Sequence, residues 1–112
     1  VLMVAEGMMR KAAPDNAGAL LLVNNLRAAR SGAPLPSMTL NSATNTYAPL
    51  TLLAERGREL YWESWRRQDL IRFGKYLNAW QEKPASDAKR LLFPIPSRSL
   101  AANPNLKQNS GY

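Results

Sequence analysis

Cysteine and histidine are both absent from these 112 residues, and each absence removes a class of chemistry. Without cysteine there is no disulfide, no thiolate nucleophile and no thiolate metal ligand. Without histidine the chain lacks the side chain that most often moves protons near neutral pH and most often binds transition metals. No apolar run approaches the ~20 residues of a membrane-spanning helix. Any acid–base or metal chemistry is therefore left to the carboxylates.

The charge balance is basic, with 15 lysines and arginines against 8 acids and a formal net charge of +7. Such an excess favours binding to nucleic acid or to another anionic surface. The cations, however, lie in small groups along the chain, and no run reaches the five or more like charges of a basic tail. We therefore prefer a solvated, moderately basic surface, and we keep a basic helical nucleic-acid-binding domain as the alternative.

The first third of the chain predicts two helices. Leu2, Ala5 and Met9 are spaced at i, i+3 and i+7, which indicates a helix over residues 1–11. Because this amphipathic pattern is already present at the first residue, we expect the chain to be the C-terminal portion of a longer protein.

The second helix follows a short break at Ala12-Ala13-Pro14, and Asp15 is its expected N-cap. Its apolar positions are also at helical spacing: Ala19, Leu22, Val23 and Leu26. Gly32 is expected to end the helix in the left-handed conformation. Helices joined by so short a link should pack antiparallel, so residues 1–32 predict a helix hairpin of the helical-repeat type.

A long bent helix is predicted within residues 49–82. Pro49 suits a first helical turn, and the helix is expected to run to about Trp80 with a bend near Ser64–Trp65 or at Gly74. Gly57 should permit a close approach by another backbone segment.

The other two segments predict irregular structure. Residues 33–48 are rich in Pro, Ser, Thr and Asn and are expected to form a loop. Residues 83–112 predict an extended tail, in which the proline-rich stretch LLFPIPSRSL forms a strap docked across the helices. The expected fold class is all-α: a helix hairpin, a long bent helix and a proline-rich C-terminal strap.

The stretch ERGRELYWESWRRQDLIRFG, residues 55–74, holds the densest mixture of acids, arginines and aromatic residues. Its acids are spaced by four and its arginines follow them by three or four, which favours ion pairs along and between helices. We expect these residues to form a structural signature: Glu55, Arg58, Glu59, Glu63, Arg66, Asp69 and Arg72. Replacing Glu59 or Glu63 should then cost stability, because a buried arginine loses its partner.

A paired-carboxylate active site is the competing interpretation of the same acids. Two carboxylates on one helix turn do not flank a substrate bond from opposite sides, and neighbouring arginines would keep both acids ionised. Glu59 and Glu63 have the spacing of a metal-ligand pair, but no histidine or Asp-rich loop accompanies them. We therefore expect no catalytic residue, no metal site and no cofactor.

The aromatic residues have two interpretations. Trp62, Trp65, Trp80, Tyr61 and Tyr76 could be stacking platforms for sugars or bases. At helical spacing such side chains belong to a packed core more often than to a ligand site, so a core role is preferred.

Three ordered motifs resemble the SusD/RagB family. The residues of the 55–74 stretch are similar to its ERxRELxxEGxRxxDLxRxG signature, although Ser64 stands where the family often has glycine. VLMVAEGMMRKAAPDNAGALLLVNNLRAARSG is similar to its preceding helix pair, and LLFPIPSRSLAANPNLKQNSGY to its final residues. The last match implies that Tyr112 lies at or near the natural C-terminus.

This resemblance implies a mostly helical protein built on tetratricopeptide-like helix pairs, which binds its cargo and is not an enzyme. Family members are lipoproteins on the outer face of the outer membrane in Bacteroidota, anchored by a lipidated N-terminal cysteine. They capture glycans or other nutrients and pass them to a TonB-dependent, SusC-like transporter. Their sugar-contacting residues come largely from loops upstream of this segment, so the resemblance assigns no ligand-binding residue here and names no particular glycan.

Overall fold

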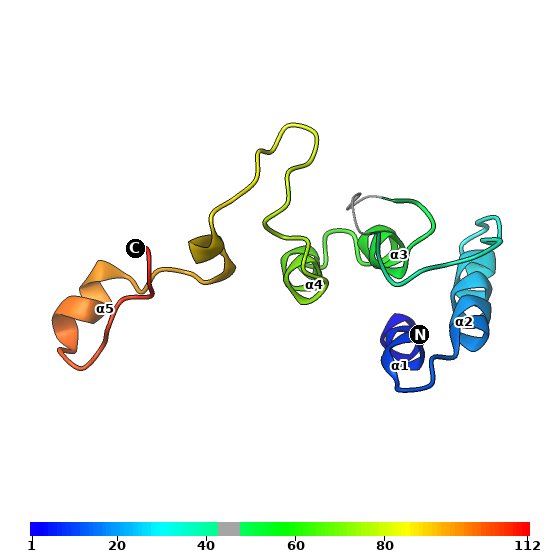
Figure 1. The fold of residues 1–112 in the computed structure, drawn as a ribbon, viewed down its shortest axis with the longest axis horizontal. Helices are drawn as coiled ribbons and strands as arrows, with labels where there is room; N and C mark the ends of the chain where they lie inside the picture. The colour runs from blue at the N-terminus through cyan, green and yellow to red at the C-terminus, as the bar shows by residue number, and fades with distance from the viewer. Residues whose placement is uncertain (43–47) are drawn as a thin grey trace.

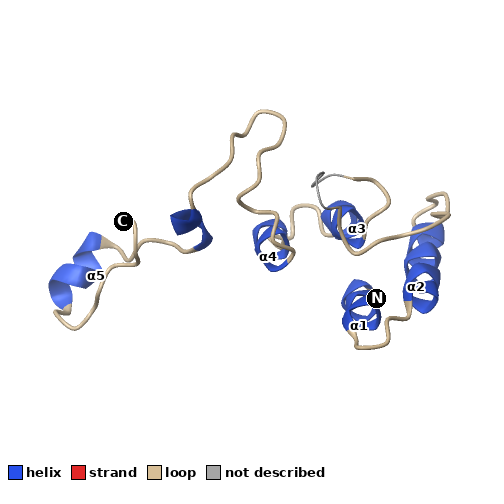
Figure 2. Ribbon diagram, in the orientation of Figure 1, coloured by secondary structure: helices blue, strands red, loops and turns tan. Residues whose placement is uncertain are grey.

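The computed structural model describes residues 1–42 and 48–112. A helical body is followed by a tail that extends away from it, and the described residues contain isolated β-bridges but no strand (Figures 1 and 2). The body contains α1 (Leu2–Arg10), α2 (Asn16–Ala29), α3 (Leu52–Glu59) and α4 (Arg66–Arg72). The tail contains a 3₁₀ turn (Ala88–Leu91) and α5 (Ser97–Ala102). Of the described helices, none has the length and apolar character needed to cross a membrane.

Helices α1 and α2 form the predicted hairpin and pack against each other (Figure 1). Asp15 caps α2 as expected, because its Oδ1 accepts a hydrogen bond of 2.8 Å from the Gly18 amide. The predicted apolar face of α1 is buried at Leu2, Ala5 and Met9, and α2 buries Ala19 and Val23.

The end of α2 differs from the prediction in one residue. Ser31, directly after the C-cap residue Arg30, takes the left-handed conformation at φ 56°, whereas Gly32 does not have a positive φ. Gly32 instead brings its amide to 2.7 Å from the Arg27 carbonyl oxygen. A Cβ on Gly32 would lie only 3.2 Å from that oxygen. Glycine is therefore favoured at position 32 because a Cβ has little room there. The left-handed residue that ends the helix is Ser31, one position earlier.

The loop after α2 contributes to the core. The Asn24 side chain binds both backbone groups of Leu35, with its Oδ1 accepting from the amide at 2.8 Å and its Nδ2 donating to the carbonyl at 3.0 Å. This paired contact fixes the loop against α2, and Leu35 and Met38 are buried beside the hairpin. The part of the predicted 33–48 loop at residues 43–47 lies outside the described residues.

Helix α3 lies between two apolar clusters. Its N-cap is Thr51, whose hydroxyl accepts from the Ala54 amide at 3.1 Å, so Pro49 precedes the helix instead of occupying its first turn as predicted. Leu52 packs into the hairpin cluster, whereas Leu53 packs with Leu70 and Phe73 of the α4 region. These two adjacent leucines join the hairpin to α4.

The predicted bend near Ser64–Trp65 is a complete break between two short helices. Trp62 and Ser64 have φ values of 67° and 63°, in the left-handed region that non-glycine residues seldom occupy. Ser64 occupies the position where the family often has glycine, which adopts this conformation without strain. Gly74, with φ 67°, follows the end of α4, so the expected continuation to about Trp80 is wrong.

The tail is held largely by side chains that bind its own backbone. Gln108 pairs with both backbone groups of Ile95, at 2.8 and 2.9 Å. Tyr112 donates to the carbonyls of Lys89 and Leu92, each at 3.0 Å. These bonds fix a backbone in which Pro84, Pro94, Pro96 and Pro104 have no amide hydrogen to donate.

Contact between the tail and the helical body runs through Arg67. Its Nη2 donates to the carbonyls of Arg90 and Leu91 at 3.0 and 3.1 Å, and its guanidinium carbon lies 4.2 Å from the Phe93 ring centroid. Phe93 is 70% exposed. A strap lying across the helices stays a prediction.

Replacing Leu52 by alanine should lower the free energy of unfolding by about 2–5 kcal/mol, because this fully buried side chain joins α3 to the hairpin. Leu21 on α2 is 62% exposed, so Leu21→Ala should change stability by no more than about 0.5 kcal/mol. Urea unfolding followed by circular dichroism measures both variants. Equal losses would contradict this description of the core.

Candidate functional site

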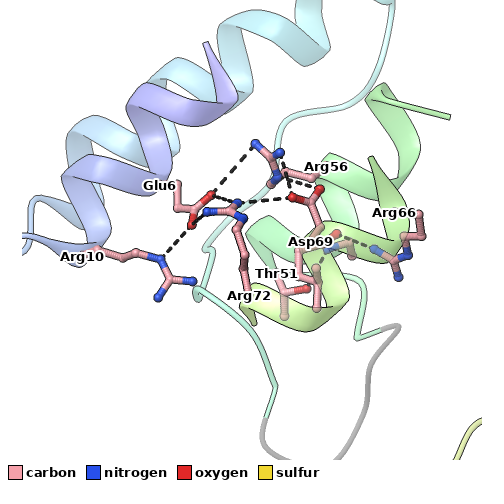
Figure 3. A network of polar contacts seen from close by, with 9 residues as sticks. Glu6, Arg10, Thr51, Arg56, Arg66, Asp69 and Arg72 are labelled. Carbon is pink, nitrogen blue, oxygen red and sulfur yellow. Dashed lines mark hydrogen bonds and ion pairs between the residues drawn. The ribbon is translucent and has the colours of Figure 1, made fainter. Parts of the chain in front are cut away.

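Charged side chains from the four helices of the body form what we call the arginine–carboxylate network: Glu6, Arg10, Arg27, Glu55, Arg56, Arg58, Asp69 and Arg72. Figure 3 shows the part of the network around Glu6 and Asp69. At its centre Arg56 of α3 donates through Nε and Nη2 to both carboxylate oxygens of Asp69 on α4, each at 2.8 Å. The side chains of Arg56 and Asp69 are 3% and 1% exposed. The pair is thus shielded from water and bidentate, the geometry in which arginine binds carboxylate most strongly.

The network continues from Asp69 to the first helix of the chain. Arg72 donates to both oxygens of Glu6 at 2.9 and 2.7 Å, and it also reaches Asp69 at 3.2 Å. Arg10, four residues after Glu6, donates to the same carboxylate at 2.8 Å. Arg56 Nη1 lies 4.0 Å from Glu6. Figure 3 shows these side chains converging from α1, α3 and α4. Two carboxylates therefore connect α3 and α4 to α1, which lies far from both in the sequence.

A second branch ties α3 to α2. Arg27 donates to both oxygens of Glu55 at 3.2 and 3.1 Å, and Arg58 binds the same carboxylate from one turn further along α3. Nearer the surface, Arg30 donates to Glu59 at 2.8 and 3.2 Å, but the Arg30 side chain is 68% exposed. Solvent screening makes this outer pair worth little, so Glu55 is the anchor of the branch.

The surroundings of Glu6 keep its carboxyl group charged. Burial raises its pKa, but the hydrogen bonds and charges of Arg72 and Arg10 outweigh burial, and the pKa lies below its ordinary value of 4.5. The hydrogen bond to Glu6 in turn raises the pKa of Arg72, against the opposing effect of burial. A general acid must hold a proton near neutral pH, and Glu6 does not. Among the described residues there is also no group of three or more acids close enough to hold a metal ion.

The structure brings together some of the predicted signature residues and separates others. Glu55, Arg58, Asp69 and Arg72 belong to the network, and Glu59 lies at its outer edge. Glu63 is exposed in the break between α3 and α4, so the expectation that its replacement exposes a buried arginine is wrong. Arg66 donates to the Leu53 carbonyl at 3.0 Å.

Gly57 accommodates Arg66 directly. A Cβ on Gly57 would lie 2.8 Å from Arg66 Nη1, so the group that approaches this glycine is the arginine side chain and not the backbone segment that was predicted.

The sequence pattern did not predict several members of the network, namely Glu6, Arg10, Arg27 and Arg56, nor Arg30 of the outer pair. The contact between Glu6 and Arg72 spans 66 residues, and no local spacing indicates it. A signal was available for Glu6, since it is an acid on the apolar side of a short amphipathic helix. Arg27 and Arg30 are cations at the end of α2, where a helix dipole alone accounts for them.

The preference for a core role is wrong for the aromatic residues of the break. Trp62 is 85% exposed and Tyr61 is 73% exposed, because the left-handed turn directs both away from the helical body. Trp65 is 43% exposed. Trp80 and Tyr76 are partly buried against the Leu53 cluster, as a core role requires.

Two surface grooves flank the break. A groove of about 350 Å³ lies on the α1 side, where Met3, Leu60 and Trp65 are among its lining residues. A larger groove of about 600 Å³ lies on the other side and includes Arg58, Tyr61, Trp62 and Arg66. The charged network thus serves as a scaffold, and the exposed aromatic residues lie beside open surface.

The fold and the network define a helical scaffold in which opposite charges are paired across helices. A profile described as the SusD family matches residues 1–112. Because that match covers the whole chain, the chain belongs to the SusD family, and the family expected from its motifs is confirmed.

Pairwise sequence comparison identifies a relative in the same family. The chain is 37% identical over 70 residues to the starch-binding protein SusD of Bacteroides thetaiotaomicron. The alignment covers 54% of this chain and 13% of the relative. The chain therefore spans a small part of the relative's length.

Asp69→Asn should lower the free energy of unfolding by about 3–5 kcal/mol, because Arg56 would keep a buried charge without its bidentate partner. Glu63→Gln is the matched control, because Glu63 is an exposed acid in the break before α4, and its effect should stay within about 0.5 kcal/mol. Chemical unfolding of both variants provides the comparison. A neutral Asp69→Asn would contradict the structural role of the network.

Glu6 should make stability depend on pH on the acid side. Its pKa is lowered in the folded state, so its contribution is fully present above the ordinary value of 4.5 and is lost as the pH falls through the folded-state value. The difference in Tm between the wild-type protein and Glu6→Gln should therefore be largest at neutral pH and shrink below about pH 4.5. Thermal unfolding from pH 7 to pH 3 tests this, and a difference that grows on acidification would contradict it.

Proposed function

We propose that this chain forms the C-terminal structural part of a cell-surface, glycan-binding lipoprotein. The complete protein binds nutrient oligosaccharides at the outer face of the outer membrane of a Gram-negative bacterium and delivers them to a SusC-like, TonB-dependent transporter. The observation that carries this proposal is the match to the SusD family over residues 1–112. The relative that is named a starch-binding protein supports a carbohydrate as the cargo.

The role proposed for these residues within the complete protein is mechanical. Glu55, Asp69 and Glu6 each bind arginines from more than one position, and these bonds connect α1, α2, α3 and α4. A binding surface keeps its affinity only if its supporting elements are rigid. The network is proposed to supply that rigidity. It also keeps the Glu6 carboxyl group ionised, because Arg72 and Arg10 lower its pKa, so Glu6 is not suited to act as a general acid. Membership of the SusD family supports the proposal that the complete protein binds its substrate without transforming it.

Nucleic-acid binding is the second candidate function, and the net charge of +7 is the observation that suggests it. A protein that binds a phosphate backbone presents its lysines and arginines to solvent along one face. Here Arg27 and Arg56 are directed inward and bind carboxylates, and Arg67 binds tail carbonyls. Much of the positive charge is therefore used within the fold, which favours the glycan-binding proposal.

Titration of the complete protein with oligosaccharides separates the two functions. The panel contains maltoheptaose, cellohexaose, mannohexaose and trigalacturonate, measured by isothermal calorimetry. We expect at least one neutral sugar to bind with an affinity that changes little between 50 and 200 mM NaCl. A protein that makes 6–10 phosphate contacts instead loses roughly 10³–10⁵ in DNA affinity over that range. Binding to a DNA duplex at 50 mM NaCl, with no sugar bound at all, would contradict the proposal.

A further inference from the structure

The last residues of the tail run back along its proline-rich stretch, and their side chains bind the carbonyls there. The Tyr112 hydroxyl lies 3.0 Å from the carbonyl oxygens of both Lys89 and Leu92, so its single proton is shared between them. Asn109 Nδ2 donates to the Phe93 carbonyl at 2.7 Å. These contacts join segments that are 16 to 23 residues apart in the sequence.

Gln108 adds a paired contact between the two prolines of this stretch. Its Oε1 accepts from the Ile95 amide at 2.8 Å, and its Nε2 donates to the Ile95 carbonyl at 2.9 Å. Pro94 and Pro96 have no amide hydrogen, so a regular β-ladder cannot form there, and an amide side chain takes the place of a backbone partner. We call the following set the C-terminal clasp: Gln108, Asn109 and Tyr112 with the backbone of residues 89–95.

Gly111 allows the clasp to close. Its φ is 90°, in the region that residues with a Cβ seldom adopt, and a Cβ there would lie 3.0 Å from Lys89 Cβ. The Lys89 ammonium group donates to the Gly111 carbonyl at 3.1 Å and lies 5.3 Å from the centroid of the Tyr112 ring. Glycine at position 111 therefore lets the chain pass close to Lys89 and brings the Tyr112 hydroxyl to its two carbonyls.

Helix α5 lies in the loop that the clasp closes (Figure 1). It has six residues, and the Leu100 amide donates to the Pro96 carbonyl at 3.2 Å. A helix of this length is unstable alone, because ordering its first turn costs more conformational entropy than so few hydrogen bonds offset. The contact of Ile95 with Gln108 holds the two ends of the loop together, which lowers the entropy that the chain loses when α5 forms.

Arg67 of α4 binds the carbonyls that lie between those bound by Tyr112. The last carbonyls of a helical turn have no partner within the turn. At the end of the 3₁₀ turn, Arg67 Nη2 donates to the carbonyls of Arg90 and Leu91 at 3.0 and 3.1 Å. Its guanidinium carbon also lies 4.2 Å from the Phe93 ring centroid. Arg67 and Tyr112 thus bind neighbouring carbonyls, and each holds the backbone in the conformation that the other requires.

We propose that residues 88–112 are one cooperative unit, closed by the C-terminal clasp and fastened to α4 by Arg67. Opening the clasp at Tyr112 then releases the 3₁₀ turn and α5 together and weakens the bonds of Arg67. The unit is separate from the arginine–carboxylate network that joins α1 to α4, so it opens and closes while those helices stay folded. This property does not depend on which ligand the complete protein binds.

Hydrogen exchange of the complete protein, measured by mass spectrometry on peptides from residues 88–112, tests the proposal. Tyr112→Phe keeps the ring and removes only the hydroxyl. Although that hydroxyl does not contact α5, exchange at amides such as Leu100 should become roughly tenfold faster, the effect of losing one or two hydrogen bonds from the unit. Gly111→Ala removes no polar group, but it should also speed exchange because it hinders closure. Exchange in α2 should stay unchanged in both variants.

Tyr61→Phe is the matched control, because it removes a hydroxyl from the break between α3 and α4 and should leave exchange in residues 88–112 unchanged. Arg67→Ala should speed exchange at the same tail amides as Tyr112→Phe. If Tyr112→Phe affects residues 88–95 and leaves α5 unchanged, the tail is not one unit and the proposal is wrong. Faster exchange in α2 to the same extent, or no change in the tail with Tyr112→Phe or Arg67→Ala, would equally overturn it.

Discussion

A bidentate ion pair between Arg56 and Asp69 lies at the centre of the helical body, and the placement of the other helices depends on it. Two charges removed from water are costly unless their geometry and their remaining hydrogen-bonding groups are satisfied. Asp69 meets that condition because Arg72 also binds it, and Arg72 carries the contact onward to Glu6 on α1. Helices of only seven to nine residues (α1, α3 and α4) would be unstable alone. The apolar clusters around Leu52 and Leu53 bury the hydrophobic side chains of these helices, and the ion pairs determine which helices lie next to each other.

The hairpin could be predicted from sequence because its signals are local. Asp15 caps α2, and the apolar positions of α1 recur at the helical period, so each helix follows from its own residues. The helix after Pro49 was predicted less well. Its break depends on Trp62 and Ser64 in a left-handed conformation that neither residue type favours, and the position of Ser31 in place of Gly32 is the same kind of exception. Tertiary contacts override local preference at such positions, which no spacing rule detects.

The charged residues show the same division. Contacts within one helix turn, such as Arg72 with Asp69, follow from spacing. Glu6 and Glu55 bind arginines from other helices, Arg72 and Arg27 respectively. The sequence predicts that such acids are paired with arginines, but it does not identify which arginine binds which acid. The aromatic residues were misassigned for a related reason. Hydrophobicity predicts burial for Trp62, but the turn that exposes it is set by the strained backbone around it. Scaffold and exposed aromatic surface are thus adjacent in a single stretch, residues 55–74.

If residues 55–74 serve mainly to hold the helices together, Arg56 and Asp69 must stabilise the fold as a pair, and a double-mutant cycle on these two residues measures that coupling. Arg56→Met leaves the buried Asp69 with Arg72 alone, and Asp69→Leu leaves the buried Arg56 without its bidentate partner, whereas the double variant removes both charges of the pair. We expect a coupling free energy of at least about 2 kcal/mol in chemical unfolding, with the double variant more stable than either single one. Losses that add to within about 0.5 kcal/mol would show that the two residues act independently and would contradict this expectation.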